Sequence, residues 1–208
     1  MFLPLIDRLR CLNGHEGTWL VASIDRVVER DVLDGTLGCP ICSAEYRIRD
    51  GEALFGDAAA APERTPSSSD ALRLAAALDL TDARMTAILH GSWGANASIL
   101  RGVSPAQLLL VNPPAGIPSG DGVSIVRGPV APLAPGWADA AALDREATVP
   151  MAESVRAGLR GGGRLLAPIG VDVTAGFAEL ARDGDVWVAQ LDPAAAAAVR
   201  VPLSRRAH

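Results

Sequence analysis

The segment 85–112, MTAILHGSWGANASILRGVSPAQLLLVN, most constrains the fold of this chain. Its first part, TAILHG, is a short apolar run that ends in glycine, which is the pattern of a buried parallel strand. ANASILRGV is then typical of a short helix, and AQLLLVN of a second strand. A strand, a glycine turn, a helix and a strand in this order predict the opening unit of a nucleotide-binding α/β sheet.

The alternation of strands and helices continues beyond residue 112. Apolar runs predict strands over 122–128, 137–143, 164–170 and 186–191, and a last, antiparallel strand over 199–203. Helices are expected over 149–163, where Pro150 suits the first turn, and over 175–184. The glycines at 161–163 are expected to form a loose turn and not a phosphate-binding loop, because they follow a helix and do not open one. The fold class is therefore α/β, with a doubly wound, mostly parallel, Rossmann-like sheet.

Four potential metal ligands lie in the first unit of the chain, residues 1–56. Cys11 and His15 occur in RCLNGHEG, and Cys39 and Cys42 occur in GCPIC, which has the Cys-Pro-x-Cys spacing of a zinc knuckle. Three thiolates and one imidazole make a complete tetrahedral set for structural zinc. The alternative is that Cys11 is a small buried apolar residue and His15 an ordinary loop residue.

The rest of this unit has the pattern of a small antiparallel ribbon. The stretch 18–31 is rich in β-branched residues, and Asp34-Gly35 and Asp50-Gly51 are turn signals. A unit this small, with so few aromatic residues, buries too little apolar surface to fold well without a cross-link such as a bound metal ion. Because four protein ligands leave no open position for water, we assign the metal to folding and not to catalysis.

The motifs of this unit place it beside a known family. Leu-x-Cys near the start, then Leu-x-Cys-Pro-x-Cys and Tyr-x-Ile-x-Asp-Gly, resemble the small zinc-ribbon proteins that activate tRNA and translation-factor methyltransferases. The likeness covers the first unit only, and His15 departs from it, because the family has a second early cysteine. The resemblance implies that the ribbon stabilises a partner and carries no chemistry of its own.

A linker and a second domain are expected after the ribbon. Residues 57–69, DAAAAPERTPSSS, have the composition of a linker. A helix capped by Ser69 or Asp70 then opens the second domain, 70–208. The order of its strands and helices, together with AGLRGGGRLLAPI at 157–169, resembles the class I S-adenosylmethionine-dependent methyltransferases. This resemblance implies a cofactor crevice at the ends of the first two strands.

The residues at that crevice depart from the family pattern. The Gly-x-Gly-x-Gly turn of the family is replaced here by His90, Gly91, Ser92, Trp93 and Gly94. The tryptophan is expected to fill part of the cofactor's place. The acid that ends the second strand in the family is replaced by Asn112, which lacks paired carboxylate acceptors. We therefore expect no S-adenosylmethionine binding: the sheet is a scaffold, or the turn and Asn112 form a modified pocket for another ligand.

Charge and composition argue against two kinds of partner. The net charge is −5, and the first unit has six arginines against nine acidic residues, so autonomous nucleic-acid binding is not expected. No apolar run is long enough to cross a bilayer, and the N-terminus lacks the basic first region of a signal peptide. Three cysteines in a metal-binding arrangement favour a cytoplasmic protein. The expected partner is another protein, and the sequence does not give the oligomeric state.

Three functional hypotheses follow. The first is a non-catalytic, zinc-binding scaffold or partner-binding protein with a degenerate methyltransferase-like domain. The second is a divergent S-adenosylmethionine-dependent methyltransferase acting on RNA or protein. For RNA, five arginines would have to form one basic cleft: Arg101, Arg127, Arg156, Arg160 and Arg164. The third is a small-molecule binding module that uses the same crevice.

Overall fold

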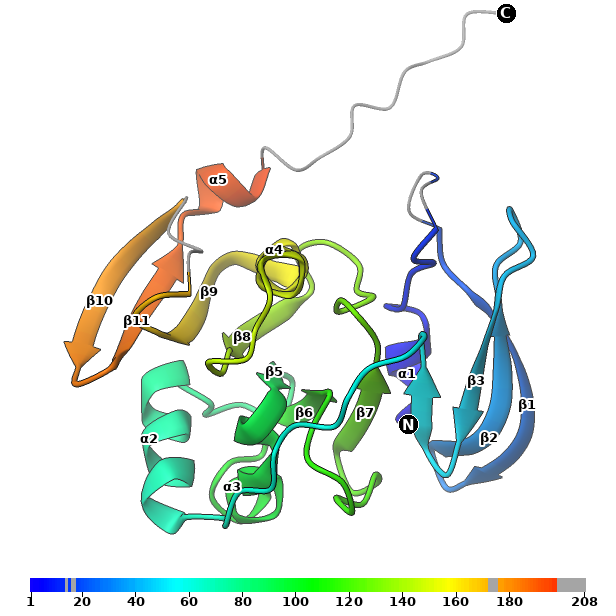
Figure 1. Cartoon of the computed structure of the whole chain (residues 1–208), viewed down its shortest axis with the longest axis horizontal. Coiled ribbons are helices and arrows are strands. Elements are labelled where there is room, and N and C mark those ends of the chain that lie inside the picture. The colour runs from blue at the N-terminus through cyan, green and yellow to red at the C-terminus, as the bar shows by residue number, and fades with distance from the viewer. Residues whose placement is uncertain (14, 16–17, 172–175, 198–208) are drawn as a thin grey trace, which may run out of the picture.

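The computed structural model describes residues 1–13, 15, 18–171 and 176–197, and these form one continuous sheet of 11 strands flanked by helices (Figure 1). The strand order is β1-β2-β3-β4-β7-β6-β5-β8-β9-β11-β10. The N-terminal strands are antiparallel and the centre of the sheet is parallel, so the expected α/β class is confirmed. The strand expected over 199–203 lies outside the described residues.

The central strands run parallel and are covered on both faces. They are β5 (Thr86–His90), β6 (Gln107–Val111), β7 (Val123–Arg127), β8 (Ala138–Ala142) and β9 (Leu159–Pro168). A 3-10 helix, η1 (Gly91–Asn96), follows β5 where an open glycine turn was expected. The helices α2 (Ser68–Leu78) and α3 (Ala97–Val103) pack on one face, and α4 (Val149–Gly158) packs on the other (Figure 1). Burial on both faces explains why these strands are near-continuous apolar runs.

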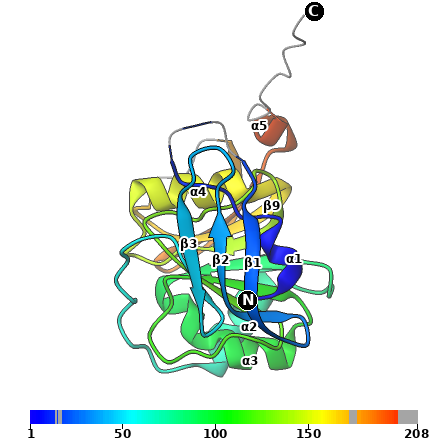
Figure 2. The same ribbon diagram turned by 90° about the vertical axis from the view of Figure 1, so that its right-hand side faces the viewer.

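The ribbon, residues 1–56, is joined to the parallel sheet by hydrogen bonds. It contains α1 (Leu3–Ile6) and an antiparallel meander of β1 (Val21–Val28), β2 (Asp31–Gly38), β3 (Glu45–Arg49) and β4 (Glu52–Leu54). Figure 2 shows β1, β2 and β3 side by side. β4 pairs in parallel with β7, with Ala53 opposite Val126. One hydrophobic core contains both Leu37 of the ribbon and Leu109 of the sheet. The division into a ribbon, a linker at 57–69 and a second domain stays a prediction, because these contacts do not test whether the two parts fold independently.

Turn chemistry explains one correct and one wrong prediction in the ribbon. Asp50 and Gly51 form the two-residue loop between β3 and β4, with φ of 48° and 79°, as an Asp-Gly hairpin requires. Gly35, in contrast, lies inside β2, where an added Cβ would be 2.6 Å from the carbonyl oxygen of Ser23. Glycine is needed there for the close approach of β1, which has a bulge next to this position.

Two further predictions in the C-terminal part were wrong. The expected helix over 175–184 is the strand β10 (Phe177–Asp183), which pairs with β11 (Val186–Leu191) through a two-residue loop. The missed signal was Gly184, whose φ of 60° suits the first position of such a loop. The glycines at 161–163 are part of β9 and lie at an irregularity in its pairing with β8, not in a loose turn. A last short helix, α5 (Pro193–Ala197), follows β11.

The segment between the ribbon and α2 has neither helix nor strand over 55–67. α2 begins earlier than expected, because the side chain of Ser67, and not Ser69 or Asp70, caps it by accepting a hydrogen bond from the Asp70 amide. The backbone amide of Ser67 also donates to Asn96 Oδ1 at 2.8 Å. These bonds attach the segment to the end of η1, next to the carboxyl end of β5. Within the described residues, no helix combines the length and the apolar character that a membrane span needs.

Candidate functional site

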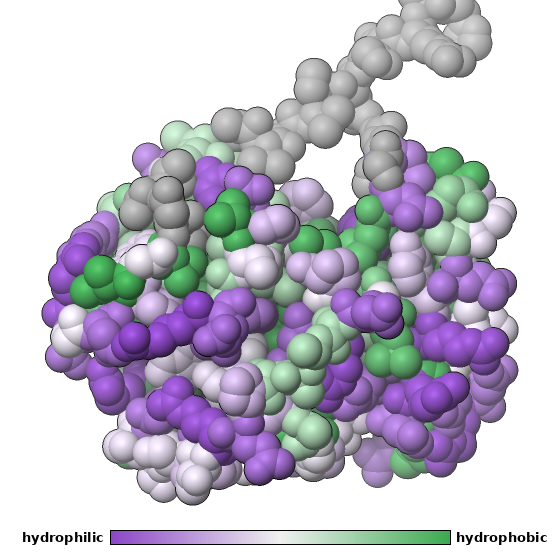
Figure 3. Space-filling view, viewed as in Figure 1, coloured by the Kyte–Doolittle hydropathy of each residue, from purple (hydrophilic) through white to green (hydrophobic). Residues whose placement is uncertain are grey.

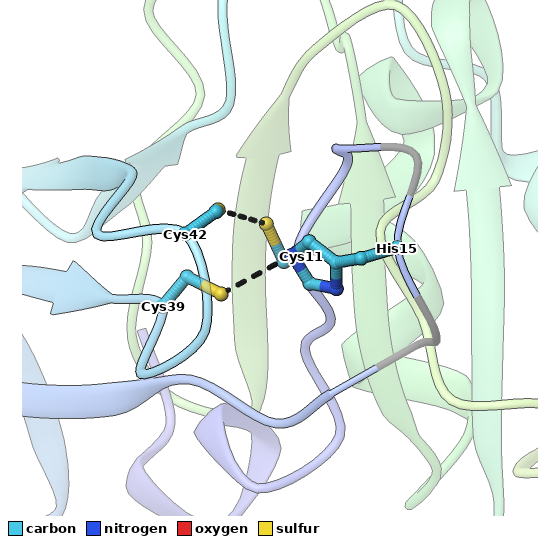
Figure 4. Close-up of side chains that lie close together, drawn as sticks. All are labelled: Cys11, His15, Cys39 and Cys42. Atoms are coloured by element: carbon cyan, nitrogen blue, oxygen red, sulfur yellow. Dashed lines mark hydrogen bonds between the residues drawn. The ribbon is translucent and has the colours of Figure 1, made fainter.

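The four predicted metal ligands come together at one end of the ribbon (Figure 4). The ligand atoms of Cys11, His15, Cys39 and Cys42 all lie within 4.8 Å of one another. The Sγ atoms of Cys11 and Cys42 are 3.7 Å apart, and Cys39 Sγ is 3.4 Å from His15 Nε2. A tetrahedral zinc ion, with Zn–S of about 2.3 Å and Zn–N of about 2.0 Å, would hold such atoms roughly 3.5–3.8 Å apart. The cluster therefore has the donor set and the spacing of a zinc centre.

Two side chains that the sequence analysis missed support the thiolates. Asn13 Nδ2 donates to Cys42 Sγ at 3.2 Å, and the Tyr46 hydroxyl lies 3.2 Å from Cys11 Sγ. The backbone amide of Ala44 and then Asn13 lower the pKa of Cys42 to about 6, which favours the metal-binding thiolate at neutral pH. Burial and then the bond to Cys11 raise the pKa of Tyr46 to about 12, so the phenol stays protonated and donates to the sulfur. Such outer partners orient metal ligands.

The cluster is placed to stabilise the ribbon. Cys11 and Cys39 are 8% and 3% exposed and belong to the hydrophobic core. The knuckle turn is closed by backbone bonds from Cys39 to Ala44 and from Ser43 to Cys39. A metal ion would therefore tie the loop between β2 and β3 to the segment after α1. With four protein ligands it would have no position for a substrate.

A second candidate site lies at the carboxyl ends of β5 and β8. The chain runs from β5 to β6 and β7 on one side, and then returns to β8 and β9 on the other side. Open α/β sheets bind ligands at such a switch point. A pocket of about 450 Å³ opens here, called the crevice below. Of the residues proposed from the sequence, His90, Gly91 and Asn112 line it, whereas the other three do not: Ser92, Trp93 and Gly94.

Asp144, directly after Leu143 at the end of β8, organises the crevice, and sequence reasoning missed it. Its Oδ2 accepts from the amide of Ser92 at 2.7 Å, and its Oδ1 accepts from the amide of Glu146 at 3.0 Å. Burial raises the pKa of Asp144, but the contacts with His90 and Ser92 outweigh burial and hold the pKa below its usual value. An acid just after a strand that adjoins the first strand falls at the switch point; the sequence shows the acid but not the strand order that places it there.

The same carboxylate lies next to His90. Nδ1 of His90 is buried 3.0 Å from Asp144 Oδ1, an ion-pair distance without the geometry of a hydrogen bond, and each side chain is only 7% exposed. Within the described part of the chain, Nε2 of His90 has no hydrogen-bond partner, so it is the ring nitrogen left for a ligand in the crevice.

Trp93 stands beside the crevice and not in it. Its indole Nε1 donates to the carbonyl oxygen of Leu143 at 3.0 Å, which ties η1 to the end of β8. The guanidinium of Arg64 lies 4.9 Å above the centre of the indole ring. The ring packs against the core that α2 and α3 form with the sheet. The expectation that its bulk fills the place of a cofactor is therefore corrected.

Asn112 lines the crevice, but its side chain is engaged inside the protein. Its Nδ2 donates to the carbonyl oxygen of Gly128 at 2.8 Å, and its Oδ1 accepts from the amide of Gly128 at 2.9 Å. This pair joins the ends of β6 and β7, and Asn112 adopts a φ of 51° to make it. Its own carbonyl oxygen accepts from the amide of Ala61 at 3.3 Å. These bonds fix the direction of the amide and leave one N–H and one lone pair of Oδ1 for a ligand.

The segment 57–62, which we call the strap, forms one wall of the crevice. It crosses the face seen in Figure 1, and Figure 3 shows weakly hydrophobic surface running down the middle of that face. The described residues of the crevice lining include three carboxylates, from Asp57, Asp144 and Glu146, and no arginine. Its charge would therefore repel a phosphate group and favour a neutral or cationic ligand.

Comparisons with known proteins give structural neighbours only: no family model matches, and no curated protein is similar. A Burkholderia thailandensis 1,6-didemethyltoxoflavin-N1-methyltransferase, bound to its substrate and S-adenosylhomocysteine, has a TM-score of 0.45 at 14% identity over 60% of this chain and 77% of that one. The pyocyanin biosynthetic protein PhzM gives 0.45 and 14% over 59% of this chain and 54% of its own. A putative S-adenosyl-L-methionine-dependent methyltransferase from Methanococcus maripaludis gives 0.44 and 12% over 60% and 84%. A likeness of this size assigns neither ligand nor activity, so function is argued from the residues of the site.

Proposed function

We propose that this chain is a metal-stabilised, methyltransferase-like scaffold that binds another protein and transfers no methyl group. The observation that carries the proposal is the engagement of Asn112. Both polar groups of its side chain bond to Gly128, which leaves one N–H and one lone pair of Oδ1 in place of the paired carboxylate acceptors that would take up the hydroxyls of a ribose. The strap is bonded to the backbone of the same residue and occupies one side of the crevice.

The ribbon supports a stabilising role. β4 continues the parallel sheet at β7, and Arg127 of β7 forms an ion pair with Glu52 of β4 at 2.5 Å. At the far edge of the ribbon, β1 pairs on one side only, with β2, and exposes Val21, Val27 and Val28. An edge strand with unpaired backbone groups and apolar side chains can add a strand of another protein.

The test is isothermal titration of S-adenosylmethionine and S-adenosylhomocysteine into protein of known zinc content. We expect about one equivalent of zinc, as four protein ligands bind one ion, and no saturable binding of either compound. Saturable binding in the micromolar range would overturn the scaffold proposal. If binding is observed, two variants show whether it occurs in the crevice. Ala60→Trp, in the strap, would block the crevice, and Ala76→Trp, on the exposed side of α2, is the matched control.

A second candidate is a divergent S-adenosylmethionine-dependent methyltransferase acting on RNA or protein. The observation that favours it is the crevice itself, which has the size of a ligand site and a buried imidazole next to a carboxylate at its wall. RNA is disfavoured, because four of the five arginines that would have to form a basic cleft are engaged with separate partners. Arg127 pairs with a carboxylate of β4, Arg160 with one of β8 and Arg164 with one at the end of α2, and Arg101 bonds to the Asp121 carbonyl oxygen. A protein substrate fits the acidic crevice better.

A further inference from the structure

A second pocket lies at the opposite end of the sheet, and none of the proposed functions uses it. Its polar floor residues stand at the amino ends of three neighbouring strands: Thr86 opens β5, Gln107 opens β6, and Ser124 is the second residue of β7. Trp137 directly precedes β8 and closes one side. The volume is about 340 Å³, within the range of small-molecule sites. We call it the amino-end pocket.

The topology explains why this part of the sheet is left open. A parallel crossover normally places a helix on the sheet, but the connection from β7 to β8, residues 128–137, contains none. The short helix α1 of the ribbon packs on the same face, through Leu5 and Ile6, and covers only part of it. The gap between α1 and Trp137 is therefore built into the connectivity, not caused by a loosely packed core.

The walls are apolar and firmly placed. Leu5 and Leu109 are 4% and 1% exposed and belong to the shared core. Phe2 is held by a hydrogen bond from its amide to Ser124 Oγ at 2.9 Å, and the guanidinium of Arg30 lies 5.2 Å from the centre of its ring. Walls that do not need to rearrange lower the cost of ordering on binding.

The charged groups of the pocket are positive. Arg8 and Arg84 line it, and among the residues that the structure describes no acidic one does. Arg84 is paired with Asp82, at 2.8 Å, whereas the Arg8 guanidinium has no hydrogen bond or ion pair with any residue that the structure describes. The indole N–H of Trp137 is likewise without a partner in the described ranges. The donors of Arg8 and Trp137 are therefore available to an anion.

We propose that the amino-end pocket binds a small organic anion, a carboxylate on a flat apolar body. The apolar body would lie between Phe2, Leu5 and Trp137, and the carboxylate would bond to Arg8. A planar guanidinium matches the two oxygens of a carboxylate. The crevice has the opposite preference, because carboxylates line it and none of its described lining residues is an arginine. One protein of net charge −5 thus has two pockets of opposite charge at the two ends of its sheet.

The experiment is calorimetric titration of the metal-loaded protein with 2-naphthoate. Two matched probes are its neutral analogue 2-naphthalenemethanol and inorganic phosphate. We expect saturable binding of naphthoate in the micromolar to low millimolar range, and at least about tenfold weaker binding of the alcohol, because the alcohol cannot form a charge-assisted bond. Binding of phosphate as strong as that of naphthoate would overturn the proposed ligand class.

Variants test whether the ligand is in this pocket. Arg8→Gln should weaken naphthoate binding about tenfold, and Ala83→Trp, at an exposed lining position, should abolish it. The matched control is Arg73→Gln, which removes an exposed arginine of α2 outside the pocket and should leave the affinity unchanged. Unchanged binding in Arg8→Gln, or no saturable binding by the parent protein at millimolar naphthoate, would refute the assignment.

Discussion

Gly91 is the crevice position where adding one methyl group should lower the free energy of unfolding most. Its φ is 62°, and a Cβ there would overlap the Asp144 carboxylate, with Cγ only 2.5 Å away. A left-handed conformation costs an alanine about 1–2 kcal/mol. Moving the carboxylate would leave the partly buried amide of Ser92 without its acceptor, which costs about 1–3 kcal/mol more. Gly91→Ala should therefore destabilise the protein by about 2–5 kcal/mol, a large part of the stability of a typical domain.

Urea unfolding, followed by far-UV circular dichroism, measures this cost. A loss of that size lowers the midpoint by about 1 M for the slope expected of a protein of this length. The matched control is Gly102→Ala in α3, where an added Cβ meets nothing within 4 Å. It should be neutral or stabilising by up to about 1 kcal/mol, because alanine is the better helix former. If the two variants unfold within about 0.5 kcal/mol of each other, the proposed anchoring of η1 by Asp144 is wrong.

Two further predictions concern the metal and acid. Chelation of the metal, or Cys39→Ser, should lower the melting temperature of the whole chain, because the ribbon shares a core with the sheet and β4 pairs with β7. A calorimetric scan in which the unfolding transition of the sheet is unchanged would contradict this. The pKa of Asp144 is lower in the folded state than its unfolded value of about 3.9. Ionised Asp144 therefore stabilises the folded protein fully at pH values above the unfolded pKa, and this stabilisation is lost as the pH falls through the folded pKa. The stability difference between the parent and Asp144→Asn should therefore shrink on acidification below about pH 4, and a difference that stays constant in urea titrations at several pH values would contradict the assignment.

The candidate sites differed in how far the sequence could predict them. The metal ligands could be named because a Cys-Pro-x-Cys turn brings two thiolates together locally, and only the pairing of Cys11 and His15 with it needed the fold. Asn13 and Tyr46, which contact the sulfur atoms of these ligands, were missed because no fixed spacing in the sequence marks such residues. At the crevice, His90 and Asn112 could be placed because strand ends are visible as the ends of apolar runs. Asp144 belongs to the site through strand order, which pattern alone left undecided.

Periodicity in the sequence determined the parallel strands, the helices α2, α3 and α4, and the Asp50-Gly51 hairpin, because each depends on neighbouring residues. Tertiary structure decided the rest. The helix-like composition of β10 was overruled by pairing with β11, because strand preference depends on packing against the neighbouring strand and not on the local sequence alone. Contacts between residues far apart in the chain also decide three other features: the direction in which Trp93 packs, the bond between the strap and Asn112, and the pairing of β4 with β7. No local pattern encodes such contacts, because their free energy exists only once the sheet has formed.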